Sequence, residues 1–327
     1  MIIPQRMGFD LGSSTVQVAI KGKGIVLEEP SVVAFYRNEG KVLAVGLAAV
    51  DMLGKTPPHI QAAYPIRHGM VVNLPVTEAM LRYFLRRVGW YYRPSLVISV
   101  PANITNVARR AVREAALAAG ASKVWLIESP LAAALGSKLD MRDPAGILVI
   151  DMGSGTTDMA VLSAGTPIIS SSVRVAGNQF NTAIQDMMRY RHKLLVSPRL
   201  AEEIKISLGS ATPPTQTESL TVCGSDLVDG KLRNQNVTNQ EVYQALAEPI
   251  QTLLEHCKQL LSQTPPTLAA DLVTRGIVLC GGGAQLDNMQ VFLQNQLQIP
   301  VCLADNPQQC VALGTMLADP ESLEEDR

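Results

Sequence analysis

Two short segments of this chain place a carboxylate at the end of an apolar run and follow it at once with small and hydroxyl residues. Asp10 opens the segment DLGSST, and Asp151 opens the segment DMGSGTT. Glycine lets backbone amides approach a ligand closely, and successive amides in a tight turn form a concave anion site. A second apolar run follows each segment, which predicts a hairpin. Rossmann and Walker-type phosphate loops instead lead into a helix, so both are disfavoured.

The residues that follow each aspartate are candidates for binding a phosphate chain. They are Gly12, Ser13, Ser14 and Thr15 in the first segment and Gly153, Ser154, Gly155, Thr156 and Thr157 in the second. A carboxylate repels a phosphate unless a cation lies between them, and Mg²⁺ fits because it keeps several waters and takes few protein ligands. We therefore expect Asp10 and Asp151 to hold hydrated Mg²⁺ or to orient an attacking water. The alternative is two ordinary hairpin turns, which the recurrence of the pattern disfavours.

Two further groups of residues could contact a nucleoside. Gly281, Gly282 and Gly283 follow a predicted buried strand and precede a predicted helix, so a ribose or a flat ring could lie against their backbone. A tight turn between strand and helix explains the same glycines. Glu202 and Lys205 lie three residues apart on one predicted helical face and could bracket a nucleoside. In isolation such a pair is more often a surface ion pair.

The surrounding pattern predicts how these segments are positioned. SLVISVP and KVWLIE are typical of buried strands, NVARRAVREAALAAG predicts a helix that ends at Gly120, and a short helix is expected from Pro130. This order of strands and helices predicts a largely parallel sheet in the first half. The pattern restarts with ILVIDMGSGTTDMAV. Helices are then expected at about 178–195, 199–209 and 239–263, with strands and loops in the polar segment 211–240.

Bulk composition restricts the class of protein. The chain has 327 residues, which favours two lobes, and its 47% hydrophobic and 17% charged residues indicate a packed globular protein. The net charge of −1 provides no general attraction for nucleic acid. Five cysteines without a C-x-x-C pair indicate reduced thiols in the cytoplasm, and Cys280 is interpreted as a small core residue. We expect neither a signal peptide nor a membrane-spanning helix.

Longer segments of the chain resemble the MreB family of bacterial actins. They include KGKGIVLEEPSVVAF, RRAVREAALAAGASKVWLIE, RVAG, AEEIKISLGSA and RGIVLCGGGAQL, and the resemblance runs from Gly8 to about Leu317. It implies an α/β, actin-like (ribonuclease H-like) duplicated fold, with two lobes of two subdomains each around a nucleotide cleft. By this resemblance, lobe I covers residues 1–144 with a smaller subdomain at about 30–65. Lobe II covers 145–317 with a smaller subdomain at about 180–240, and 318–327 form a tail.

The resemblance also implies a function. Such proteins bind ATP, or GTP, with Mg²⁺, act as weak ATPases and polymerise into filaments of identical subunits. The filaments lie on the inner face of the cytoplasmic membrane, where they organise the membrane proteins of wall elongation and so determine rod shape. Carried over by position, the two glycine hairpins bind the phosphates. The residues that surround the nucleoside are Gly177, Glu202, Lys205, Gly281, Gly282 and Gly283.

The segment LIESPLAAALG departs from the family at a position that matters for hydrolysis. The family normally has two glutamates before this proline, and the second polarises the attacking water; here the pair is Glu128 and Ser129. A serine hydroxyl is a far weaker base than a carboxylate, so slow hydrolysis is expected. Glu128 is a poor substitute because neighbouring strand residues point to opposite faces. Ser129 before Pro130 also has the pattern of a helix N-cap, which would explain the serine by stability.

A second departure is AGNQFNTAI, in which Asn178, Gln179 and Asn181 stand where relatives carry acids. The loss of charge would alter either the electrostatics of the cleft or a filament contact.

The segment RRVGWYYRP is the candidate membrane loop. Relatives carry a short apolar loop here that enters the bilayer, and this chain has Trp90, Tyr91, Tyr92 and Arg93 after Arg86 and Arg87. Trp and Tyr favour the headgroup region, and each arginine near anionic lipid adds about 1 kcal/mol. The alternative is that the aromatic rings pack against the protein.

The glycine hairpins and the late glycine cluster also resemble the wider actin, hexokinase and DnaK-chaperone superfamily, which offers alternative functions. A small-molecule kinase would need a substrate pocket with a catalytic base, and a chaperone would need a C-terminal peptide-binding domain; neither has a candidate segment. An adaptor that binds nucleotide without hydrolysing it or polymerising stays open because of Ser129.

Overall fold

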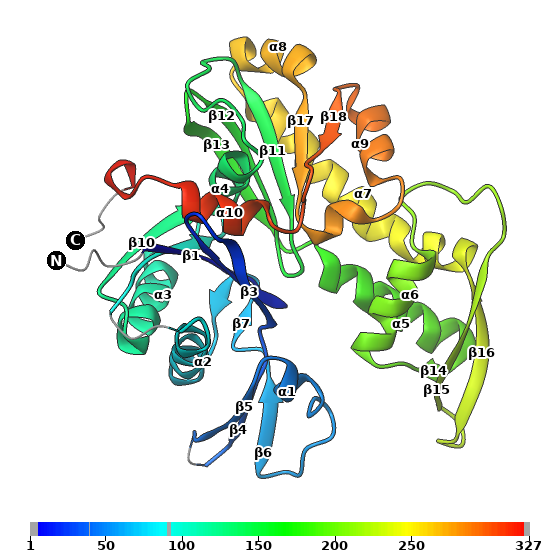
Figure 1. Ribbon diagram of the computed structural model, residues 1–327. Coiled ribbons are helices and arrows are strands. Elements are labelled where there is room, and N and C mark those ends of the chain that lie inside the picture. Colours follow the sequence, from blue (N-terminus) through cyan, green and yellow to red (C-terminus); the bar gives the residue numbers. More distant parts are fainter. Residues whose placement is uncertain (1–5, 39, 90–92, 324–327) are drawn as a thin grey trace.

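Two five-stranded sheets form the centres of two lobes in this computed structural model, which describes residues 6–38, 40–89 and 93–323 (Figure 1). The first sheet has the order β10-β9-β1-β2-β3 and the second the order β13-β12-β11-β17-β18. In the first, the strands are β1 (Arg6–Leu11), β2 (Thr15–Ile20), β3 (Gly24–Pro30), β9 (Ser95–Val100) and β10 (Lys123–Glu128). In the second, they are β11 (Ile147–Met152), β12 (Thr157–Ser163), β13 (Thr166–Val173), β17 (Ile277–Cys280) and β18 (Val301–Leu303).

The two sheets repeat one plan. In each, the strand that ends near the aspartate forms an antiparallel hairpin with the next strand and a parallel pair with a later one. The hairpins predicted from the glycine segments are therefore confirmed. The prediction of a largely parallel first sheet is wrong, because the sheet is mixed. β2 pairs antiparallel with β1 and β3, and the parallel pairs are those of β9 with β1 and with β10.

A small sheet accompanies each large one. β4 (Val33–Tyr36), β5 (Val42–Val45) and β6 (Ile60–Ala63) pair in the order β5-β4-β6 beside the short helix α1 (Leu47–Val50). β14 (Leu194–Leu195), β15 (Ser219–Asp226) and β16 (Leu232–Thr238) pair in the order β14-β15-β16. In Figure 1 the first small sheet lies at the bottom of the view, and the second lies at the right, beyond α5 and α6. The hairpin of β7 (Ile66–Arg67) and β8 (Met70–Val71) returns the chain to the first lobe.

Helices α2 (Leu74–Arg87), α3 (Asn106–Ala119), α6 (Pro198–Leu208) and α7 (Asn239–Gln263) begin where the sequence supplies a side-chain cap. α3 starts after Thr105, whose side chain accepts a hydrogen bond from the Ala108 amide, and ends at Gly120 with φ 119°. α7 opens with a capping box between Thr238 and Glu241. The remaining helices are α4 (Ser129–Gly136), α5 (Gly177–His192), α8 (Pro266–Arg275), α9 (Met289–Leu297) and α10 (Cys310–Leu317), with 3-10 turns at Gly282–Gln285 and Pro320–Ser322.

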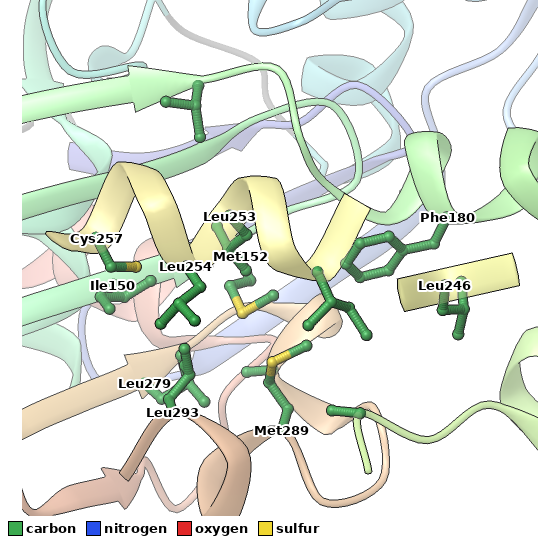
Figure 2. Packing of buried hydrophobic residues seen from close by; sticks show 14 of the residues in the cluster. Ile150, Met152, Phe180, Leu246, Leu253, Leu254, Cys257, Leu279, Met289 and Leu293 are labelled. Atoms are coloured by element: carbon green, nitrogen blue, oxygen red, sulfur yellow. The ribbon is translucent and has the colours of Figure 1, made fainter. Parts of the chain in front are cut away.

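The core of the second lobe fixes the strand ends that carry Asp151 and the glycine turn. Figure 2 shows Leu253, Leu254 and Cys257 of α7 near Ile150 and Met152 of β11, with side chains of β17 and α9 below them and Leu246 of α7 further along the helix near Phe180. Their spacing along α7 follows the helical period, so one face is buried. Burying each such side chain contributes about 1.5–3 kcal/mol.

Two short helices lie between the lobes. α4 contacts β9 and β10 of the first sheet as well as β11 and β12 of the second, and α10 packs on α4 and on β1 and β2. The backbones approach closely, since a Cβ on Gly314 would overlap the carbonyl oxygen of Ala132. α10 belongs to the range expected for lobe II, yet the first sheet is its main support.

In the described part of the chain, no helix combines the length and the apolar character needed to cross a membrane.

Candidate functional site

The first glycine hairpin carries a partly exposed carboxylate that is fixed by its neighbour strand. The Ser99 hydroxyl of β9 donates a 2.7 Å hydrogen bond to Oδ1 of Asp10 and accepts one from the Leu11 amide at 3.2 Å. The turn itself is tight, because a Cβ on Gly12 would lie 2.5 Å from the carbonyl oxygen of Thr15. Asp10 is thereby held at the end of β1, with the turn residues Gly12 to Thr15 directly beyond it.

The second hairpin meets the first across the lobe boundary. A Cβ on Gly155 would collide with the Ser13 side chain and lie 3.1 Å from the His68 amide. His68 places Nδ1 2.9 Å from the Gly155 carbonyl oxygen, and the Gly69 amide donates to the Ser13 hydroxyl at 3.1 Å. The two predicted phosphate turns thus lie side by side. His68 is not among the residues predicted for this site.

Not every hydroxyl of the second turn faces outward. Thr157 is fully buried and donates to the Val175 carbonyl oxygen at 2.6 Å, so its side chain supports the sheet. Thr156 donates to Asp158 at 2.7 Å. The turn is closed by the bond from the Gly153 amide to the Thr156 carbonyl oxygen at 2.9 Å.

Three carboxylates interact at this boundary, and one of them was missed from the sequence. Burial raises the pKa of Asp10 to about 6, and the charge of Asp158 adds to this. Burial also raises the pKa of Asp158 to about 6, against hydrogen bonds that lower it. The pKa of Asp151 is raised well above its ordinary value by burial and then by the charges of Asp10 and Asp158. The three groups therefore oppose one another's ionisation.

Asp158 also joins the two lobes. Its Oδ1 accepts a 2.9 Å hydrogen bond from the Ala102 amide, which follows β9 of the first sheet. Asp158 is the antiparallel partner of Asp151, and the equivalent position opposite Asp10 is Gln17. The equal spacing of seven residues in the two hairpins was a signal available in the sequence. Gln17 is buried, and its Oε1 has no hydrogen-bond partner among the described residues.

The predicted nucleoside residues assemble next to the second turn. The Gly177 amide donates to the Gly153 carbonyl oxygen at 3.2 Å, and a Cβ on Gly177 would lie 3.4 Å from Nζ of Lys205. Lys205 forms a 2.8 Å ion pair with Oε2 of Glu202. The same oxygen accepts a 2.6 Å hydrogen bond from Nδ2 of Asn181. This ion pair is therefore part of a connected polar group, and Asn181 belongs to it.

One acceptor atom in this polar group has no hydrogen-bond partner across the ranges that the structure describes, and a tyrosine of the first lobe lies near the group. Oδ1 of Asn181 is buried and lacks a hydrogen-bond partner within the described chain. Tyr64, from the first lobe, lies near enough that the charge of Glu202 adds to burial in raising the tyrosine pKa. A buried acceptor without a partner is costly, which favours a donor supplied by a ligand.

The glycine turn after β17 lies against the second hairpin. A Cβ on Gly281, which has φ 84°, would overlap the Met152 carbonyl oxygen and approach Oδ1 of Asp151 to 2.7 Å. A Cβ on Gly283 would lie 3.0 Å from the same carbonyl oxygen. Gly282 makes only ordinary contacts, the nearest with the Gln308 side chain. Glycine is required at Gly281 by close approach as well as by φ, which supports the tight-turn explanation without excluding a ligand.

Ser129 does not cap a helix, so that prediction is wrong. α4 has Glu128 at its N-cap position with no side-chain capping bond, and the buried Ser129 hydroxyl donates to the Val100 carbonyl oxygen at 3.1 Å. Glu128 accepts from the Asn103 amide and pairs with Arg109, each at 3.4 Å. Neither residue 128 nor residue 129 thus offers an uncommitted base, because the serine proton and the glutamate charge both have partners.

Trp90, Tyr91 and Tyr92 of the expected membrane loop lie outside the described residues. The flanking arginines Arg86, Arg87 and Arg93 are exposed. Arg87 lies 3.4 Å from buried Glu29 and is still 58% exposed.

Comparison with known proteins identifies the family of this arrangement. The sequence model of the MreB/Mbl protein family matches residues 4–325. The cell shape-determining protein Mbl of Bacillus cereus (strain ATCC 10987 / NRS 248) is 43% identical over 312 residues, which cover 94% of each chain.

Solved structures agree with the sequence comparison. A crystal structure of MreB5 of Spiroplasma citri bound to ADP superposes with a TM-score of 0.91 at 30% identity, covering 96% of this chain and 95% of the other. A MamK double helical filament subunit superposes with a TM-score of 0.80 at 20% identity, covering 95% and 98%. The expected actin-like α/β fold is confirmed.

Proposed function

This chain belongs to the MreB/Mbl family of actin-like proteins, and from that premise we propose that it binds ATP with Mg²⁺ between its lobes and polymerises into filaments. The observation that carries the proposal is the contact between the two glycine hairpins at Ser13 and Gly155, with Asp10 and Asp151 behind them. Turns of this kind present backbone amides to an anion, and two of them suit a chain of phosphates.

The carboxylates fit a divalent cation. Asp10, Asp151 and Asp158 hinder one another's ionisation, so a cation beside them would stabilise the charged forms. Within the described chain, no group of three His, Cys, Asp or Glu side chains is arranged to hold a metal ion directly. Mg²⁺ would therefore be held by Asp10 and Asp151 through water, where it would neutralise phosphate charge.

The nucleoside would be held on the other side of the second turn. Glu202 and Lys205 offer an acceptor and a cation, and Asn181 fixes Glu202 through its amide. The backbone at Gly281, Gly282 and Gly283 would lie against the base or ribose. The related MreB5 of Spiroplasma citri is bound to ADP in its crystal structure, which supports nucleotide binding by this chain. ATP is preferred to GTP in this proposal.

Hydrolysis would be slow. Ser129 replaces the carboxylate that would polarise water, and its proton is committed to Val100. The carboxylates that remain near the phosphates are Asp10 and Asp151, which can orient a water but share their charge with the cation. The protein would thus be a weak ATPase with long-lived filaments.

Filaments of this chain would lie on the inner face of the cytoplasmic membrane and organise the membrane proteins of wall elongation. Exposed Arg86, Arg87 and Arg93 support contact with anionic lipid, with the segment 90–92 between them. One loop would bind weakly, whereas a filament presents many copies, so that avidity multiplies the attraction. Relatives named cell shape-determining proteins support the cellular role.

Calorimetry and pelleting test the proposal. Titration with ATP and Mg²⁺ is expected to give saturable heat that Asp151→Asn abolishes and that Asp140→Asn, an exposed carboxylate, leaves unchanged. Electron microscopy and sedimentation with ATP should show filaments. Absence of heat would refute the nucleotide site. Binding without filaments would favour the alternative, an adaptor that binds nucleotide and neither hydrolyses it nor polymerises.

Liposome co-sedimentation tests the membrane role. Trp90→Ala/Tyr91→Ala should greatly reduce pelleting with anionic vesicles, while the filaments themselves persist. Undiminished binding of this variant would refute the loop's role.

A further inference from the structure

Two cysteines far apart in the sequence share one hydroxyl group behind the glycine turn. The Ser137 hydroxyl oxygen lies 3.3 Å from Sγ of Cys280 and 3.4 Å from Sγ of Cys310. Cys280 ends β17 and Cys310 opens α10. Both thiols are buried, with 0% and 2% of each residue exposed, and both belong to the apolar cluster between the lobes. Nothing in the proposed nucleotide site uses them.

We propose that Cys280 and Cys310 are an oxidisable dithiol that closes into a disulfide when the protein meets a hydroperoxide. The two sulfur atoms both contact the same hydroxyl oxygen, that of Ser137. Ser137 is only partly buried and precedes exposed Lys138, so the pair lies one side chain below the surface. A small oxidant can reach it by local opening there.

Cys310 is the sulfur suited to react first. It stands at the start of a helix, where backbone amides favour a negative charge. The Ser137 hydroxyl donates to the Cys310 sulfur at 3.4 Å, which would stabilise a thiolate, while the neutral thiol donates to the Asn306 carbonyl oxygen at 3.2 Å. The Cys257 thiol contrasts with it, because burial raises its pKa to about 12 and it donates to the thioether sulfur of Met159 at 3.6 Å.

The chemistry balances with hydrogen peroxide as the oxidant. The Cys310 thiolate attacks one peroxide oxygen, the S–O bond forms, the O–O bond breaks, and the departing hydroxide takes a proton to give water. The Cys280 sulfur then attacks the Cys310 sulfenic acid, the S–S bond forms, and the S–O bond breaks. The leaving hydroxide takes the Cys280 proton. The two sulfurs lose two electrons, and the peroxide becomes two water molecules.

The disulfide would act on the nucleotide site, a consequence that rests on the proposed function. Cys280 precedes Gly281, whose amide donates to the Pro307 carbonyl oxygen at 2.7 Å, and Cys280 is paired in register with Asp151. A bond from residue 280 to residue 310 closes this loop covalently. Because Gly281 touches the Met152 carbonyl oxygen and Asp151, movement there reaches the second hairpin. We expect weaker ATP binding by about fivefold or more in the oxidised protein.

Peptide mapping after peroxide treatment tests the site directly. The full chain with Cys223→Ser and Cys302→Ser, which removes both exposed thiols, is oxidised and then alkylated in denaturant. The expected product lacks two hydrogen atoms, has lost two alkylatable thiols and yields one linked peptide pair, 280 with 310, that a reductant separates. Cys257→Ser in the same background should give the same product. Cys280→Ser should instead leave Cys310 as a sulfenic acid that dimedone labels.

Two outcomes overturn the inference. They are unchanged thiols at peroxide levels that oxidise free cysteine, and linkage through Cys257 instead of between Cys280 and Cys310. Calorimetry on the linked and reduced forms tests the consequence. Equal ATP affinity would overturn the coupling to nucleotide, whereas failure of the reduced protein to bind ATP would refute the proposed function and leave the mapped disulfide standing.

Discussion

In the proposed function, Ser129 is the residue that sets the rate of hydrolysis. A carboxylate at this position would be a general base, which is worth about 10²–10⁴ in rate. Ser129→Glu is therefore expected to raise phosphate release by at least about tenfold under polymerising conditions. Ser129→Ala provides the control, because it removes the bond to Val100 and supplies no base. It should lower stability by about 1 kcal/mol and leave the rate unchanged. A brisk wild-type rate equal to that of Ser129→Glu would contradict the hypothesis.

Asn181 holds the Glu202 carboxylate in place through a hydrogen bond. Asn181→Asp replaces a 2.6 Å charge-assisted hydrogen bond with two neighbouring carboxylates. We expect ATP affinity, measured by calorimetry, to fall by about tenfold or more, since such a bond is worth about 1.5–3 kcal/mol. Asn178→Asp adds the same charge at an exposed position of the same helix and should have little effect. Equal losses in both variants would indicate a general charge effect instead.

The sequence indicated a functional role for Ser129 more clearly than for Asn181. Ser129 stood out as a departure within a recognisable segment, but its cap role failed because the hydroxyl turned to the Val100 carbonyl oxygen of a neighbouring strand. Asn181 was noted without a role, since its partner Glu202 lies on the next helix, and helix packing is not contained in local spacing.

At the scale of elements, strand ends bring carboxylates together at the lobe boundary, and this has a pH signature. The pKa of Asp10 is about 6 in the folded chain against 3.8 ordinarily, so the folded state binds the proton more tightly. Stability from this group is present below about pH 4 and is lost as pH rises through about 6. Because Asp10 is partly exposed, the effect is about 1–2 kcal/mol.

Asp10→Asn removes this dependence. In chemical unfolding of the nucleotide-free protein, the variant should gain stability over wild type as pH rises from about 4.5 to 7, by about 1–2 kcal/mol. Addition of ATP and Mg²⁺ should reverse the order at pH 7, because wild type alone would bind them well. A difference that does not change with pH would contradict the raised pKa.

The α4–α10 helix pair depends on glycine. A Cβ on Gly314 would overlap the Ala132 carbonyl oxygen, and backbone cannot yield as a flexible side chain can. Gly314→Ala should therefore cost about 3 kcal/mol or more of unfolding free energy. Gly282→Ala, where the added methyl meets only ordinary contacts, is the matched control and should cost less than about 1 kcal/mol. Similar losses of unfolding free energy in both variants would indicate that α4 and α10 move apart to accommodate the added methyl group.

Elements with strong local signals were predicted well, and those defined by contacts were not. α7 and the two hairpins followed from caps, helical spacing and glycine turns. α8 and α10 were missed: α8 follows α7 after a short break, and α10 is so apolar throughout that it has no amphipathic period. Asp158 was missed although it faces Asp151 in the hairpin, because its role depends on the Ala102 amide of the other lobe.

At the scale of the whole molecule, the lobes are joined at two levels. Near the two glycine hairpins, His68 contacts Gly155, and Asp158 accepts from the Ala102 amide. Further out, Nδ2 of Asn103 donates to the Ser170 carbonyl oxygen at 2.6 Å, and the Ser170 hydroxyl donates to Oδ1 of Asn103 at 3.3 Å. A ligand held between the lobes would be released only when such contacts open.

The outer contact can be removed without disturbing the backbone. Asn103 has φ 57°, a conformation that glycine adopts freely, so Asn103→Gly deletes both hydrogen bonds and keeps the turn. Exposed bonds of this kind contribute about 0.5–1.5 kcal/mol. The release of a bound fluorescent ATP analogue, measured by adding excess unlabelled ATP, should therefore accelerate by about three- to tenfold. Ser170→Ala keeps the carbonyl acceptor and should give a smaller change. If Asn103→Gly releases the analogue at the wild-type rate, opening of the lobes at Asn103 and Ser170 does not limit exchange, and the inner contacts at His68 and Asp158 must hold the ligand.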